Sequence, residues 1–176
     1  SVDLQPMMAW SKELVVSMMS NGETSPALQK QIDSIDQWKI GEMCVGGGFT
    51  KGGSMQYLQR SEMSPASAVR DFMKAFGDLG KITANGIEQE YTYQSAAEKV
   101  NGLEVDMLRI KQSVQEEFDP TGMTSAILES MYGEDGMQQL VAIDGDIVYQ
   151  VMSGSLEDLG LLMEAKGTAS PAYQAT

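Results

Sequence analysis

Tight-turn signals between short strand-like segments constrain the fold of this 176-residue chain more than any other feature. Asn101-Gly102 and Asp144-Gly145 each separate two such segments, and a glycine-rich stretch, 46–53, separates a third pair. Asparagine, aspartate and glycine suit the positive φ angles that two-residue hairpin turns require. Hairpins pair their strands in antiparallel orientation. The sequence therefore predicts an antiparallel sheet built from β-hairpins.

Six strands are expected in these three hairpins, from period-two alternation and β-branched or aromatic content. The predicted pairs are 37–46 with 54–60, 87–94 with 103–110, and 138–143 with 146–152. In the second pair, Ile87, Gln89 and Tyr91 share one face. Alternation in 103–110 changes phase at Leu108 and Ile110, which predicts a β-bulge.

Helical spacing alternates with the hairpins, and capping residues mark the helix starts. Ser25, Ser64 and Asp119 each precede a proline, which is favourable at the first helical position. Ser155 with Asp158 resembles a capping box. Five short amphipathic helices are expected from the apolar stripes. The stripes are Met7 to Met19, Leu28 to Ile35, Val69 to Phe76, Met123 to Met131 (with Ile127 and Leu128), and Leu159 to Met163.

One α+β domain over 1–167 follows from this alternation, with 168–176 as a flexible tail. A helical pair, 6–36, precedes the hairpin and helix alternation of 37–167. Each helix has one apolar stripe and can bury one face. We therefore expect the amphipathic helices to pack on one face of the antiparallel sheet.

Charge and composition exclude several classes of function. The chain has 12 basic and 25 acidic residues, a net charge of −13, and no histidine. An acidic surface repels phosphate backbones, so no nucleic-acid partner is expected. Without histidine, Ser-His-Asp and Cys-His catalysis and His-ligated zinc are ruled out. No apolar run approaches the ~18–20 residues of a membrane span, so no integral membrane segment is expected.

The glycine-rich stretch and its neighbour Cys44 carry weak catalytic signals. A phosphate-binding P-loop needs its lysine after the glycines and a helix next. Lys51 precedes its glycines, and the next element is a predicted strand. We interpret 46–53 as a mobile loop whose Lys51 is a candidate ligand contact. Cys44 lacks the basic neighbours that activate a thiol, so we predict a buried, inert strand residue.

Acidic residues cluster at three places but match no metal-binding loop. The clusters are Glu116-Glu117 with Asp119, Glu134-Asp135, and Asp144 with Asp146. Calcium loops take six to eight oxygens at regular spacing, which none of them provides. We expect no metal and no cofactor. Hydrolysis by a carboxylate pair remains an alternative, because the sequence does not reveal which acids lie close together.

Fourteen methionines are the most unusual part of the composition. Thioethers bind Cu(I), but most of these residues lie on apolar stripes and are better explained by packing. Methionine chains repack easily and can line an irregular cavity. The expected ligand-contacting residues between sheet and helices are Met18, Met19, Phe72, Met73 and Phe76, with Lys51 in the loop.

Three functional hypotheses remain open. The first is a non-enzymatic binding or structural module with an unknown protein or apolar small molecule as partner. The abundance of Gln and Ser and the scarcity of Lys favour an extracytoplasmic location, periplasmic or secreted. The second is a carrier of a lipid-like apolar ligand, which a cavity of several hundred Å³ would favour. The third is a carboxylate-based hydrolase.

Overall fold

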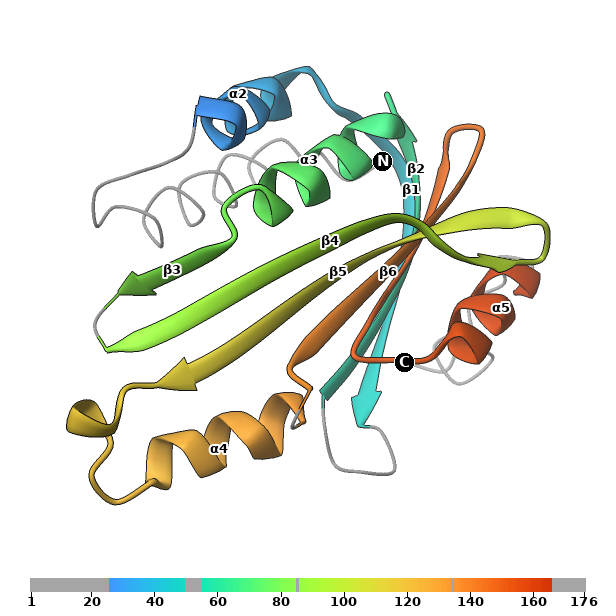
Figure 1. Cartoon of the computed structure of the whole chain (residues 1–176). Coiled ribbons are helices and arrows are strands. Elements are labelled where there is room, and N and C mark those ends of the chain that lie inside the picture. Colours follow the sequence, from blue (N-terminus) through green and yellow to red (C-terminus); the bar gives the residue numbers. More distant parts are fainter. Residues whose placement is uncertain (1–25, 50–54, 85, 134, 166–176) are drawn as a thin grey trace, which may run out of the picture.

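The computed structural model describes residues 26–49, 55–84, 86–133 and 135–165, and its central element is a seven-stranded sheet (Figure 1). The strands are β1 (Lys39–Phe49), β2 (Met55–Ser64), β3 (Lys81–Ala84), β4 (Ile87–Val100), β5 (Leu103–Val114), β6 (Met137–Asp144) and β7 (Ile147–Met152). All neighbours pair antiparallel in the order β1-β2-β7-β6-β5-β4-β3. The predicted α+β class and all three hairpins are confirmed, and β3 is an additional strand.

Within the described residues, four α-helices and two short 3-10 turns connect or cover the strands. They are α2 (Pro26–Ser34), η1 (Ile35–Gln37), α3 (Ser67–Gly77), η2 (Glu116–Phe118), α4 (Met123–Tyr132) and α5 (Leu156–Glu164). Helix α3 takes the chain from β2 to the edge strand β3, and the following strands return to β2 through β7 (Figure 1). None of the described helices is long and apolar enough to cross a membrane.

The helices cover both faces of the sheet, which corrects the expectation of a single covered face. Leu140 and Val141 are consecutive in β6 and therefore point to opposite faces. Val141 packs in a buried cluster with Met73 of α3, whereas Leu140 packs with Leu159 of α5. Since α5 is only nine residues long, it closes the second face locally and leaves the far ends of β4 and β5 open on that side.

The predicted bulge in 103–110 is wrong, because helices cover both faces of the sheet at this strand. Val105 belongs to the cluster under α5, and Leu108 belongs to the cluster under α3, so both phases of the alternation are apolar. The pairing of β5 with β6 continues without a shift. The irregularity lies in β4 instead, between Gln94 and Glu98.

Local signals for caps and turns mostly hold. The capping box of α5 is present: the Asp158 amide donates to Ser155 Oγ, and the Asp158 carboxylate accepts from the Ser155 amide. Asn101 and Gly102 both have positive φ, as the two-residue turn requires. The proline positions were wrong for two helices. Helix α3 begins at Ser67 and α4 at Met123, each two or three residues after the proline.

The predicted burial of Cys44 is wrong, because the thiol is exposed. Cys44 lies on β1, the edge strand, where nearly every residue is exposed. Gly46 to Gly48 continue this strand and pair with β2 as far as Phe49, so the loop is shorter than expected. Lys51, the first predicted helix with Met18 and Met19, and the tail 168–176 lie outside the described residues.

Candidate functional site: an apolar cleft under α4

A partly open cleft of about 720 Å³ lies between the sheet and α4. Its lining comes chiefly from β3, β4 and β5, from the end of α3 and from one face of α4. Figure 1 shows α3 and α4 on opposite sides of these strands in the view. Its lining residues are Phe76, Ile82, Ile87, Gln89, Tyr91, Ile110, Gln112, Ser113, Val114, Ser125, Leu128, Glu129, Tyr132, Gly133, Gly136 and Met137. The lining is mostly apolar with a few polar groups, which is typical of small-molecule sites.

Three cross-strand rows of side chains make up the floor. Residues directly opposite each other in adjacent strands share a face and touch. The rows are Tyr91, Ile110 and Met137; Ile82, Gln89 and Gln112; and Ile87 with Val114. Two amide side chains therefore sit side by side between apolar rows. They are positioned to hydrogen-bond a polar group of a ligand that is otherwise apolar.

Tyr91 closes the inner end of the cleft and is fixed on both sides. Its hydroxyl donates to Gln89 Oε1 at 2.7 Å, and burial raises the pKa of this hydroxyl above the ordinary tyrosine value. The hydroxyl therefore stays protonated and keeps its hydrogen bond. The Tyr91 ring lies 5.6 Å from the Phe76 ring, and Phe72 and Trp38 extend this aromatic row along α3. Tyr91 and Phe76 therefore lie together in the lining, with Phe72 and Trp38 packed behind them.

Helix α4 turns a mixed face toward the cleft. Ser125, Leu128, Glu129 and Tyr132 line it, at the i, i+3, i+4 and i+7 positions of one helical face. The stripe of Met123, Ile127 and Met131 points away and is 66%, 51% and 40% exposed, and α4 has no buried residue. The expectation that this stripe packs against the sheet is wrong for three of its four residues, since only Leu128 faces the strands.

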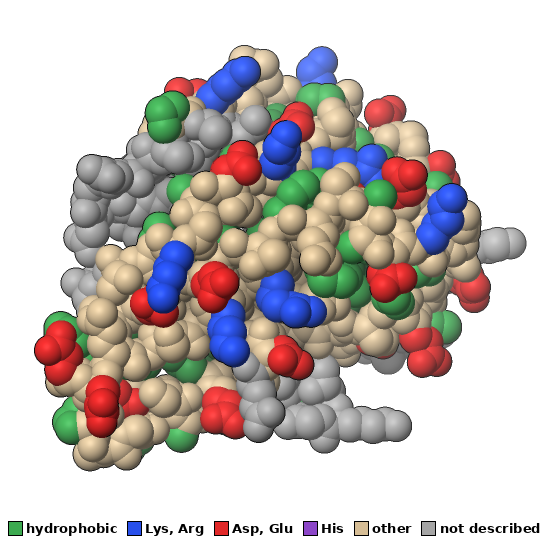
Figure 2. Space-filling model, in the orientation of Figure 1, with side chains coloured by type: hydrophobic (Ala, Val, Ile, Leu, Met, Phe, Trp, Pro, Cys, Tyr) green, Lys and Arg blue, Asp and Glu red, His purple; other side chains and the backbone are tan. Residues whose placement is uncertain are grey.

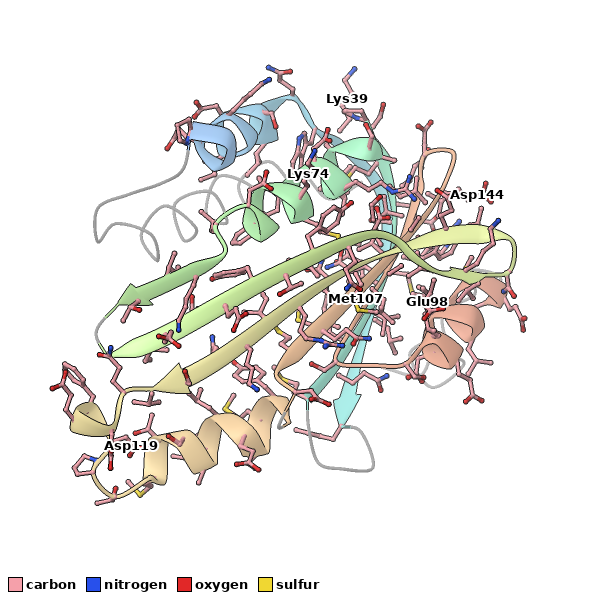
Figure 3. All side chains as sticks on the ribbon, in the orientation of Figure 1. Lys39, Lys74, Glu98, Met107, Asp119 and Asp144 are labelled. Carbon is pink, nitrogen blue, oxygen red and sulfur yellow. The ribbon has the colours of Figure 1, made fainter. Side chains whose placement is uncertain are left out.

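Both ends of α4 are capped by local hydrogen bonds. Asp119 accepts hydrogen bonds from the amides of Thr124 and Ser125 at 3.1 and 2.8 Å, and Figure 3 shows it at the start of the helix. These bonds, chiefly that from Ser125, lower the pKa of the Asp119 carboxyl. At the other end the Gly133 amide donates to the Glu129 carbonyl, and Gly133 has positive φ. These local bonds define where the helix begins and ends.

The predicted contact residues take different places in the structure. Phe76 lines the cleft, and Phe72 lies beside it with ring centroids 4.9 Å apart. Met73 is fully buried and fills the core under α3. Sequence reasoning missed the floor glutamines and the polar residues of α4. The shared face of Ile87, Gln89 and Tyr91 was a signal for the floor, but nothing in the sequence indicated which face of α4 would meet it.

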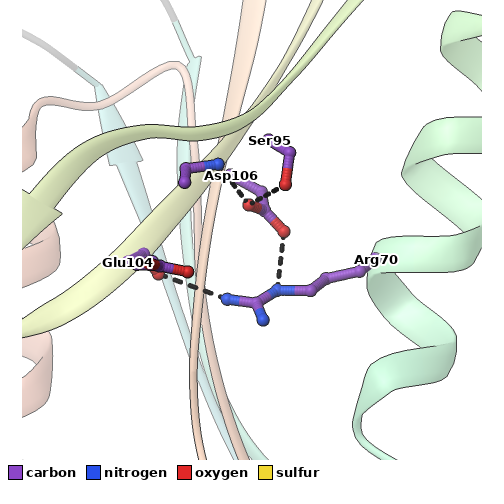
Figure 4. Close-up of polar contacts among 5 residues, drawn as sticks. Arg70, Ser95, Glu104 and Asp106 are labelled. Carbon is purple, nitrogen blue, oxygen red and sulfur yellow. Dashed lines mark hydrogen bonds and ion pairs between the residues drawn. The ribbon is translucent and has the colours of Figure 1, made fainter.

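A second polar site lies outside the cleft, between α3 and the bulge of β4 (Figure 4). Asp106 of β5 is 1% exposed, and its Oδ2 lies 2.6 Å from Arg70 Nε. Its Oδ1 accepts from the Ala96 amide at 2.8 Å and from Ser95 Oγ at 3.4 Å. Ala96 has positive φ, at 49°. The carboxylate thus holds the bulge to α3, a structural role that uses both of its oxygens.

Three further acidic residues lie at a helix cap and a hairpin turn. Asp158 caps α5, and the Ser155 amide lowers the pKa of its carboxyl. Asp144 and Asp146 flank Gly145 in the β6–β7 hairpin. Among the described residues, no three His, Cys, Asp or Glu side chains are grouped so that they could hold a metal ion.

Comparison with protein-family models, with curated proteins and with solved structures finds no match for this chain. The geometry of the cleft is therefore the main guide to its function.

Proposed function

We propose that this protein binds an apolar, lipid-like small molecule in the cleft under α4 and acts as a non-enzymatic carrier or binding protein. The cleft itself carries the proposal. Its volume of about 720 Å³ falls within the ~300–1,000 Å³ of typical ligand sites. The cleft is partly open, and its mostly apolar lining faces that space. A concave, mostly apolar site of this size with a few polar groups is typical of small-molecule binding.

The polar groups of the cleft suit binding better than catalysis. Gln89 and Gln112 offer amide donors and acceptors but are neither nucleophiles nor bases at neutral pH. Tyr91 stays protonated and bonded to Gln89. Glu129 is the one acidic residue among the described residues of the lining. Hydrolysis by a carboxylate pair needs two acids, one on each side of the bond that is cleaved. The carrier hypothesis is therefore preferred, and an exported location stays a prediction from composition.

A pair of tryptophan substitutions on opposite faces of the sheet tests the proposal. Gln112→Trp fills the floor of the cleft, whereas Thr92→Trp places the same side chain on the exposed opposite face. Binding of 1-decanol, a neutral apolar probe, is measured by calorimetry and by thermal shift, since a ligand that binds only the folded state raises the melting temperature.

Wild type and Thr92→Trp should bind the probe alike. Gln112→Trp should weaken binding tenfold or more, a loss of about 1.4 kcal/mol. Equal binding by all three proteins would place the probe elsewhere, and no binding by the wild type of 1-decanol or longer alkyl alcohols would remove the proposal.

A further inference from the structure

We infer that the ligand of this cleft is a cationic amphiphile, an apolar body carrying an ammonium or similar positive group, and this rests on the proposed function. Glu129 is the one charged side chain among the described residues that line the cleft. It lies on α4 at the rim and is exposed. No described ion pair or hydrogen bond engages its carboxylate. A ligand that places a positive group there gains an ion pair, and an anionic ligand meets repulsion.

Basic side chains near the floor are directed away from the cleft. Lys81 and Lys111 alternate with the lining residues Ile82 and Ile110 or Gln112, so they lie on the opposite face of the sheet. Lys81 is also paired with Glu88 there at 2.6 Å. A fatty-acid carboxylate in the cleft would therefore find no described cation to pair with.

The end of the molecule around α4 has no described basic residue near Glu129 in the sequence. The sequence from 112 to 165 contains no lysine or arginine. Figure 2 shows acidic and apolar side chains, and no basic ones, at the end of the molecule formed by η2 and α4. The local field at this end thus favours positive over negative ligands before any contact is made.

Aromatic rings extend the preference for a positive group. Tyr132 lies three residues after Glu129 on the face of α4 that lines the cleft, so the two side chains are neighbours. Aromatic faces attract ammonium groups, including quaternary ones. The carboxylate and the ring together form a site for a positive head at the rim, and the apolar floor takes the body.

Three probes that share a ten-carbon chain test the inference: decyltrimethylammonium, 1-decanol and decanoate, each below its micelle concentration. An exposed ion pair gives roughly two- to fivefold in affinity. Binding to the wild type should therefore fall in that order, with about tenfold between the cationic and anionic probes. Raising the salt concentration should narrow this ratio by screening.

Matched charge variants separate Glu129 from the net charge of the protein. Glu129→Gln should abolish most of the preference, and Glu129→Lys should reverse it toward decanoate. Glu164→Gln removes the same charge from exposed α5, which packs on the other face of the sheet, and should leave the preference unchanged.

Equal loss of preference in Glu129→Gln and Glu164→Gln would overturn the inference, because the net charge would then explain it. Equal binding of all three probes to the wild type would also overturn it. In both cases the carrier proposal would survive if Gln112→Trp still blocked 1-decanol. Failure of every probe to bind would instead count against the carrier proposal itself.

Discussion

Helices α5 and α4 are nearly equal in length, nine and ten residues, yet they meet the sheet in different ways. Helix α5 packs Leu159 at 0% exposure into a cluster with Val105, Leu140 and Val151. Helix α4 buries no residue and leaves an open cleft between itself and β5. One half of the sheet is therefore closed by well-packed helices on both faces, and the other half is an open site.

The difference shows that an apolar stripe permits burial without deciding it. The stripe of α5 faces the sheet, whereas Met123, Ile127 and Met131 of α4 face solvent. A residue such as Leu159 loses its contact with water and stabilises the fold. An open cleft keeps apolar area available for a ligand, at the cost of that stabilisation. Ligand-binding regions are commonly among the less stable parts of a protein, as α4 is expected to be here.

In the closed half, the first test removes the carboxylate of Asp106. Asp106→Ala leaves Arg70 without its partner and the Ala96 amide without its acceptor. The Arg70 side chain is 35% exposed and regains some water, so the loss should fall below the ~3–5 kcal/mol of a fully buried pair, at about 2–3 kcal/mol. Urea denaturation should show a loss of this size in the free energy of unfolding. The double variant Asp106→Leu with Arg70→Met removes both charges and should recover part of the lost stability. A loss below about 1 kcal/mol in Asp106→Ala would show that the fold does not need this ion pair.

Truncating one aliphatic residue in each helix compares the two halves directly. Leu159→Ala should destabilise by about 2–5 kcal/mol, because it leaves a cavity in the closed core. Ile127→Ala in α4 should change stability by no more than about 0.5 kcal/mol, because its side chain is already half exposed. Leu161→Ala, an exposed position on α5, is the control within the same helix and should resemble Ile127→Ala. Similar losses for Leu159 and Ile127 would contradict the distinction between the halves.

Acid should loosen α4 while the closed core persists. The pKa of Asp119 is lowered in the folded state, so its contribution to stability is present above the ordinary carboxyl pKa of about 3.9 and is lost as the pH falls through the lower folded value. Hydrogen exchange should show faster exchange of the Thr124 and Ser125 amides in this range. Asp119→Asn should show the faster exchange already at neutral pH. Simultaneous loss of protection in β6 would indicate that α4 is not an independent unit.

Local signals in the sequence predicted the elements well, because their causes are local. Asn101-Gly102 forms the predicted turn because both residues tolerate positive φ. Ser155 and Asp158 form the predicted capping box because this motif needs only four consecutive residues. Signals that depend on neighbours failed. The phase change at Leu108 was interpreted as a bulge, and Cys44 as buried, because the sequence does not state which faces are covered or which strand lies at the edge.

The sequence by itself determined the hairpins, the amphipathic helices, the acidic balance and the exclusion of histidine chemistry, because each depends on composition or on residues close along the chain. Only the tertiary structure decided the site. The cleft requires β3, β4 and β5 to align their rows, and it requires α4 to turn Leu128 and Glu129 inward and Ile127 outward. Those choices depend on strand pairing between distant segments and on how α4 lies against the strands, which no local pattern encodes.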